Sequence, residues 1–145
     1  MVERLLVAVA VLAVASLGYL WWARRDGRVR RVDDEVGSLS SEQLGERRGY
    51  RATFVQFSTD TCAKCPPTAT LLRRIAAGER GVSHVEIDAV ARIDLARRFD
   101  ILRTPTTLVL NHNGVVVARI SGAPSEASAR EALEAAPPPT TDYSI

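Results

Sequence analysis

The stretch RATFVQFSTDTCAKCPPTATLLRRI, residues 51–75, decides the fold. Its beginning is rich in β-branched and aromatic side chains and predicts a strand. Its end brings Leu72 and Ile75 onto one face at helical spacing and predicts a helix. Between strand and helix lie the only two cysteines of the chain, Cys62 and Cys65. Such a pair is used as half of a metal site, as a structural disulfide or as a redox catalyst.

Strands and helices alternate along the rest of the chain. The strand patterns are residues 51–57, 82–88, 106–110 and 115–121, and the helical patterns include 91–99 and 125–135. Strands separated by helices indicate parallel pairing, and the Asn113-Gly114 turn predicts an antiparallel hairpin. Ser40 and Ser125 are predicted helix N-caps. We therefore expect an α/β sandwich with a mixed sheet and flanking helices.

Length and composition bound the class of protein. The chain has 145 residues, of which 46% are hydrophobic and 25% charged, and its net charge is +2. This composition is typical of a globular protein with one domain of ordinary size. The small net charge, without aromatic residues among the basic ones, indicates no nucleic-acid partner.

An uncharged apolar run near the N-terminus, Leu5–Trp22, predicts a membrane anchor. As a helix it would span roughly 27 Å, which is long enough to cross a bilayer. Tyr19, Trp21 and Trp22 lie at its end, where aromatic rings favour the headgroup region. The alternative is a cleaved signal peptide, since Ala13–Ala15 has a small-x-small pattern. The weak positive charge before the run favours the anchor.

The flanking charges predict the orientation of this anchor. Five arginines follow it, whereas Arg4 alone precedes it; the five are Arg24, Arg25, Arg28, Arg30 and Arg31. Because cytoplasmic flanks carry the excess of basic residues, we expect a single-pass protein of the cell membrane with a cytoplasmic domain. The basic segment also suits anionic headgroups, although a solvated linker has the same composition.

These patterns divide the chain into four parts. The expected parts are an anchor at 1–22, a basic linker at 23–37, a domain at 38–136 and a disordered tail at 137–145.

The context of the cysteines favours redox chemistry. A zinc site needs four ligands, and His84 and His112 lie at unlike spacings on different elements, so we expect no metal. A disulfide across such a short loop removes little denatured-state entropy. A C-x-x-C after a strand and at the start of a helix is instead the context of a redox motif. The positive helix end would lower the pKa of a thiol at Cys62, and Cys65 would be the resolving thiol.

From about Thr53 to Leu133 the sequence resembles the thioredoxin family. Besides the C-x-x-C, the resemblance rests on Thr104-Pro105-Thr106 before a strand and on NHNGVVVARISGA, residues 111–123. It implies a thioredoxin-like three-layer sandwich behind the anchor and a cis peptide bond before Pro105. It also implies that Thr104 and Pro105 bind an extended substrate segment and that no cofactor is bound.

The sequence departs from the family pattern around the motif. Thr61 replaces the usual tryptophan, and Pro66-Pro67 follow the second cysteine directly, so we expect a late or irregular helix start. Between the cysteines, Lys64 would favour a thiolate at Cys62. The nearby Asp60 would oppose it.

The family's buried acid aligns with Gln56, and the lysine that pairs with it aligns with His84. Because an amide cannot accept the proton of Cys65 as a carboxylate does, His84 is the candidate base. Glu86, on the same strand face, is a second candidate.

The leading hypothesis is a membrane-tethered thiol-disulfide oxidoreductase that reduces protein disulfides. Its partners would be disulfide-containing proteins and an electron donor such as a thioredoxin reductase. One alternative is an outward-facing reductase or isomerase of exported proteins. Another is a non-catalytic interaction module that keeps the fold.

Overall fold

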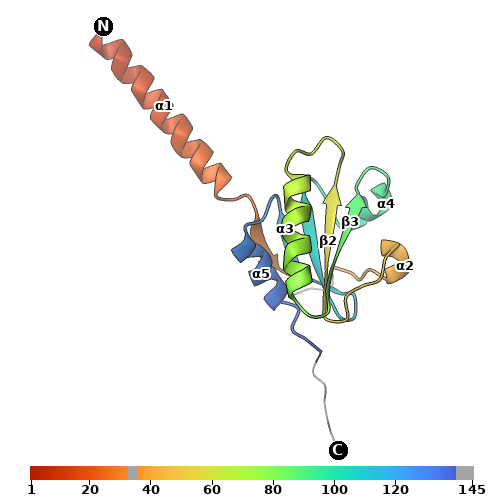
Figure 1. Cartoon of the computed structure of the whole chain (residues 1–145). Helices are drawn as coiled ribbons and strands as arrows, with labels where there is room; N and C mark the ends of the chain where they lie inside the picture. The colour runs from red at the N-terminus through yellow and green to blue at the C-terminus, as the bar shows by residue number, and fades with distance from the viewer. Residues whose placement is uncertain (33–35, 140–145) are drawn as a thin grey trace, which may run out of the picture.

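A computed structural model describes residues 1–32 and 36–139 (Figure 1). Its elements are α1 (Val2–Ala23), β1 (Arg28–Arg31), α2 (Ser41–Leu44), β2 (Ala52–Ser58), α3 (Cys65–Gly78), β3 (Val82–Asp88), α4 (Ile93–Arg98), β4 (Thr106–Asn111), β5 (Val116–Ser121) and α5 (Glu126–Glu134). The tail expected at 137–145 falls largely on residues 140–145, which lie outside this description.

The strands form one mixed sheet in the order β1-β5-β4-β2-β3. β2 and β3 are parallel and are joined by α3, as strands separated by a helix predict. The pairs β2–β4, β4–β5 and β1–β5 are antiparallel. The predicted mixed sheet is therefore confirmed.

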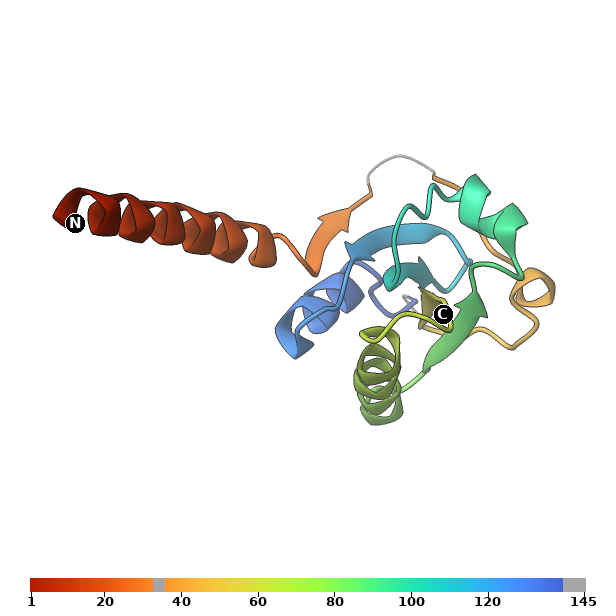
Figure 2. The ribbon, with the colours of Figure 1, turned by 90° about the horizontal axis from the view of Figure 1, so that it is seen from above.

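Helices cover both faces of the sheet, so the domain has three layers (Figure 2). On one face, α3 and α5 bury Leu72, Ile75 and Leu133 against Phe54 and Ile120 of the sheet. On the other face, short helices and loops pack against inward side chains of the same strands. That second core includes Leu44, Val55, Phe57, Val85, Ile87, Leu95, Phe99, Leu108 and Leu110. β2 lies between the two cores, and each of its residues is buried.

Local signals set where the shorter elements begin and end. The Ser40 hydroxyl accepts from the Gln43 N–H at 3.2 Å, and the Gln43 side chain accepts from the Ser40 N–H at 3.0 Å. Such a capping box fixes the start of α2, and Ser125 caps α5 through the N–H of Ser128. In the β4–β5 turn, Gly114 has φ 83°, a conformation that favours glycine.

The prediction of a linker over residues 23–37 is wrong at Arg28–Arg31, because these four residues form the strand β1. This strand pairs with β5, whose edge N–H and C=O groups would otherwise lack strand partners. The arginine side chains of β1 stay exposed, while Val29 packs against the core under α5. Backbone pairing therefore outweighs a composition that is typical of a linker.

The N-terminal helix α1 extends away from the domain and buries none of its residues (Figure 1). Its 22 residues are long and apolar enough to cross a membrane. The helix includes the predicted run Leu5–Trp22.

Two leucine substitutions test the core. Leu72 is 0% exposed and Leu102 is 93% exposed. We expect Leu72→Ala to lower the free energy of unfolding by about 2–5 kcal/mol, because it removes apolar contacts and leaves a cavity. Leu102→Ala, the matched control, should change it by less than about 0.5 kcal/mol. Urea unfolding of the full chain in detergent measures both; equal losses would contradict the assignment of the core.

Candidate functional site

The two cysteines lie where the central strand meets its helix. β2 ends at Ser58 and α3 begins at Cys65, so Cys62 lies in the connecting loop. The Cys62 N–H donates to the Thr59 carbonyl, and the Cys65 N–H donates to the Cys62 carbonyl, both at 3.1 Å. These bonds hold the loop in tight turns directly before the helix.

The helix does not begin late, contrary to the expectation from the two prolines. Its first residue is Cys65, and Pro66 and Pro67 lie in the first turn. N–H groups there have no intrahelical acceptor, so proline is tolerated. The prolines leave the first turn with fewer N–H donors, although Cys62 still lies at the positive end of the helix.

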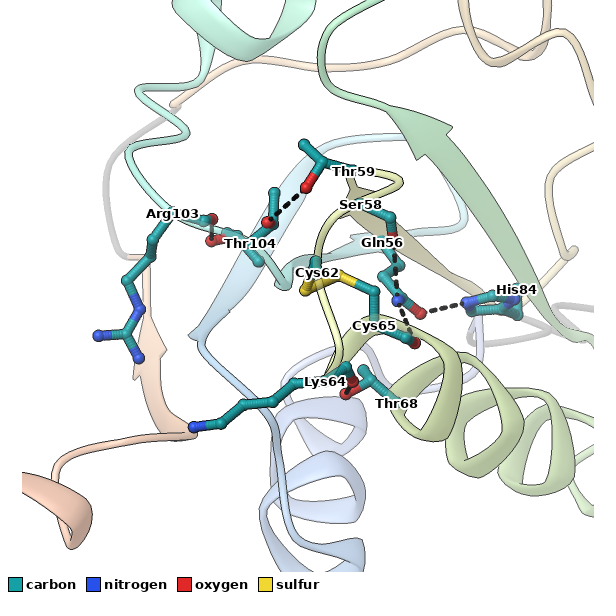
Figure 3. The surroundings of a disulfide bond; sticks show 11 residues. Gln56, Ser58, Thr59, Cys62, Lys64, Cys65, Thr68, His84, Arg103 and Thr104 are labelled. Carbon is teal, nitrogen blue, oxygen red and sulfur yellow. Dashed lines mark hydrogen bonds between the residues drawn. A yellow bond between two sulfur atoms is a disulfide. The ribbon is translucent and has the colours of Figure 1, made fainter.

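Cys62 and Cys65 form a disulfide, with their Cα atoms 5.4 Å apart. Cys62 is half-buried, whereas Cys65 is only 2% exposed. Both line a cavity of about 450 Å³ at the end of the sheet. Cys62 is thus the more exposed of the two residues that the disulfide joins (Figure 3).

A second loop lies beside the cysteine loop. The Thr104–Pro105 peptide bond is cis, and the Pro105 carbonyl accepts from the Gly122 N–H at 2.8 Å. The hydroxyls of Thr104 and Thr59 are 3.3 Å apart and share a hydrogen bond (Figure 3). The structure therefore brings Thr104 and Pro105, which are far from the cysteines in sequence, to the same end of the sheet.

Behind the disulfide, Gln56 makes three hydrogen bonds. Its Nε2 donates to the Ser58 hydroxyl at 2.9 Å and to the Cys65 carbonyl at 3.0 Å. Since both amide hydrogens are used, Oε1 is the acceptor toward His84 Nε2, which lies at 3.0 Å. Neutral His84 then carries its proton on Nε2. Gln56 thus separates His84 from Cys65.

Burial keeps His84 neutral. Desolvation is the largest cause that lowers the pKa of His84, to about 4, and the charge of Arg73 lowers it further. The carboxylate of Glu86 acts in the opposite direction. Near neutral pH the ring is therefore uncharged, and its Nε2–H donates to Gln56.

Glu86 faces the cavity beside the disulfide. It lines the cavity that Cys62 and Cys65 also line, together with Asp60 and Asp88. Its Oε2 pairs with Arg73 at 3.1 Å. Of the two side chains expected to transfer a proton, Glu86 faces this cavity and His84 contacts Gln56.

Lys64 extends away from the disulfide, toward the segment that precedes β1 (Figure 3). Its Nζ lies 2.8 Å from Asp26 Oδ2, and Arg103 contacts the other oxygen of the same carboxylate. The positive charge of Lys64 is therefore partly neutralised by the carboxylate of Asp26. Asp26 was not predicted as a site residue, because it lies in a charged segment without a motif. Arg103 was not predicted either, although its position directly before Thr104 could have indicated that it lies near the site.

The described ranges 1–32 and 36–139 contain no group of three or more His, Cys, Asp or Glu side chains able to hold a metal ion.

No protein-family model and no curated protein matches the sequence. Solved structures of thioredoxins do match the fold. Thioredoxin f from spinach chloroplast has 26% identity, over 61% of this chain and 72% of that chain, with a TM-score of 0.53. The Fasciola hepatica thioredoxin has 23% identity, over 66% and 89%, with a TM-score of 0.55. A Nicotiana alata thioredoxin has 23% identity, over 61% and 75%, with a TM-score of 0.53.

The domain therefore has the thioredoxin fold. This fold and the C-x-x-C pair support a protein of the thiol-disulfide oxidoreductase class. Together they also support placing the chain in the thioredoxin family, as the sequence motifs implied.

The pKa of His84 yields a test of the hydrogen bonds behind the disulfide. By NMR, we expect the ring to titrate near pH 4 instead of near 6.5. As the pH falls, His84 is protonated in the unfolded chain near pH 6.5 and in the folded chain only near pH 4. The free energy of unfolding should therefore fall as the pH drops from 6.5 to about 4. His84→Gln, whose amide can still donate to Gln56, should reduce this pH dependence. A ring that titrates near 6.5 would contradict the proposed burial.

Proposed function

We propose that this chain is a membrane-tethered protein disulfide reductase that uses the Cys62–Cys65 dithiol. The observation that carries the proposal is the unequal exposure of the two cysteines: Cys62 is half-buried and Cys65 is 2% exposed. A two-step exchange requires one thiol that a substrate can reach and a second that can reach only the first.

In the first step, the reduced enzyme presents the thiolate of Cys62 to a substrate disulfide. The thiolate attacks one substrate sulfur and forms a mixed disulfide. The other substrate sulfur leaves as a thiolate and takes a proton from water. The positive end of α3 favours the attacking thiolate.

In the second step, Cys65 loses its proton and its thiolate attacks the sulfur of Cys62. The bond between Cys62 and the substrate breaks, and the second substrate sulfur leaves as a thiolate. Two electrons have then passed to the substrate, and the enzyme holds the disulfide seen in the structure. An electron donor such as a thioredoxin reductase must return two electrons. The exchange uses no bound cofactor.

The loop at Thr104 and Pro105 is the proposed substrate-binding segment. In the parts of the chain described, 1–32 and 36–139, no hydrogen bond engages the backbone N–H or C=O of Thr104. Its peptide groups are therefore available to an extended substrate segment beside Cys62, in the manner of an added strand.

The proton of Cys65 has two candidate acceptors. Glu86 lines the cavity next to Cys65, so its carboxylate can receive the proton through water in the cavity. His84 reaches Cys65 only through Gln56, and its Nε2 already carries a proton in that arrangement. We assign the transfer to Glu86 and the positioning of Gln56 to His84.

The tether is α1, whose length and composition suit a bilayer. The five arginines that follow it favour a cytoplasmic domain, where reductants keep thiols reduced.

The two-step exchange predicts that Cys65→Ser traps substrates. Without the resolving thiol, mixed disulfides through Cys62 should accumulate in cells and appear as adducts on non-reducing gels. These adducts should disappear on reduction. Cys62→Ser is the matched control and should trap far less, because its remaining thiol is buried. Absence of adducts with Cys65→Ser would contradict catalysis and favour a non-catalytic module.

The orientation predicts that Cys62 is protected in intact cells. A membrane-impermeant thiol reagent should label Cys62 only after the cells are permeabilised and the disulfide is reduced. Ready labelling in intact, reduced cells would overturn the cytoplasmic assignment. It would favour a reductase or isomerase of exported proteins.

A further inference from the structure

The connection between α1 and β1, residues 24–27, is held by backbone hydrogen bonds along its whole length. The N–H groups of Arg24, Arg25 and Asp26 donate to carbonyls in the last turns of α1, at 3.0, 3.0 and 3.3 Å. The next N–H, of Gly27, donates to the Ser121 carbonyl of β5 at 2.9 Å. The chain thus passes from the helix into the sheet with successive backbone groups bonded.

Asp26 attaches this connection to both loops of the site. Its carboxylate pairs with Lys64 of the cysteine loop and with Arg103 of the loop that holds Thr104. The Asp26 side chain is 17% exposed, and Arg103 also donates to the Ser121 carbonyl at 3.1 Å. A network of this kind constrains geometry more than an isolated surface pair does.

Gly122 makes this approach possible. Its φ is 93°, and a Cβ at this position would collide with the side chains of Asp26 and Arg103. The close packing of the connection against the site therefore requires glycine here.

The strand register places the anchor at the cysteine end of the sheet. Arg28 pairs with Ser121, Ser121 with Thr106, and Thr106 with Phe57, so these residues form one row across four strands. Phe57 is followed by the cysteine loop, whereas the β4–β5 turn lies at the opposite end of β2. That strand has seven residues, which is about 20 Å. Figure 1 shows α1 leaving on the side toward which β2 points.

From this arrangement we infer that the active site works at the bilayer surface, on disulfides that other membrane proteins hold close to that surface. The inference rests on the proposed function, because it assumes that α1 is in the bilayer. Asp26 is three residue steps from the end of α1, at most about 11 Å. Lys64 contacts Asp26 directly, so the cysteine loop lies close to where α1 leaves the membrane.

The surface around the site suits such a partner. Val90, Ile93 and Leu102 are 72%, 52% and 93% exposed, and they line a hollow of about 450 Å³ together with Thr104. A membrane protein that exposes aromatic side chains beside its membrane span can cover this hollow with them. At the end of α1, Arg24 and Arg25 suit anionic headgroups.

A depth measurement tests the orientation without requiring activity. The probes are Thr61→Cys, in the cysteine loop, and Asn113→Cys, in the β4–β5 turn, each in the full chain with Cys62→Ser and Cys65→Ser. Both positions are exposed. Each protein carries a fluorophore and is placed in phosphatidylcholine/phosphatidylglycerol nanodiscs with a quencher on the headgroups. We expect stronger quenching at position 61. Equal quenching, or stronger quenching at 113, would overturn the inference.

A flexible insert then tests the connection. About ten Gly/Ser residues between Ala23 and Arg24 add roughly 17 Å of mean reach and release the orientation. Quenching at position 61 should fall toward that at 113. The same insert after Pro138 is the control and should leave the difference intact. Quenching unchanged by the insert at Ala23 would show that the connection does not set the orientation.

An activity measurement on the protein with its native cysteines tests whether substrates held at the bilayer surface are preferred. The substrate is one disulfide peptide, either free or attached to a lipid headgroup by a short link. The insert at Ala23 should slow reduction of the attached peptide by about threefold or more and leave the free peptide unaffected. If the insert slowed reduction of both peptides equally, the inference that the substrates are held at the bilayer surface would be overturned. Failure to reduce either peptide would refute the proposed function, while the quenching result would still decide the orientation.

Discussion

The complete burial of β2 is the constraint on which the rest of the structure depends. Its side chains enter two separate cores, and it pairs with β3 on one side and β4 on the other. A shift of its register by one residue would exchange the two cores and expose their packing. The end of β2 is therefore fixed, and the loop that carries Cys62 begins there.

Sheet pairing then brings distant segments to that end. The antiparallel return of β4 starts at Thr106, directly after the loop of Thr104 and Pro105. The pairing of β1 with β5 adds Asp26 from the segment after α1. Glu86, the loop of Thr104 and Pro105, and Asp26 are thus brought to the cysteine loop from distant parts of the sequence.

The elements with strong local patterns were predictable. β3 has the predicted bounds, and Ser40 and Ser125 cap helices as expected, because alternation and capping depend on neighbouring residues. β1 was missed because its arginines carry no strand pattern and its stability comes from a partner far along the chain. The start of α3 was misjudged for a related reason, since the first turn tolerates proline.

The sequence by itself determined the cysteine pair between a strand and a helix, the loop of Thr104 and Pro105, and an apolar segment able to cross a membrane. These are properties of residue type and short spacing. Only the tertiary structure decided that Gln56 separates His84 from Cys65, that Glu86 faces the cavity, and that Asp26 holds Lys64 and Arg103. Such contacts depend on strand order and register, which long-range burial and backbone pairing select and which no local pattern encodes.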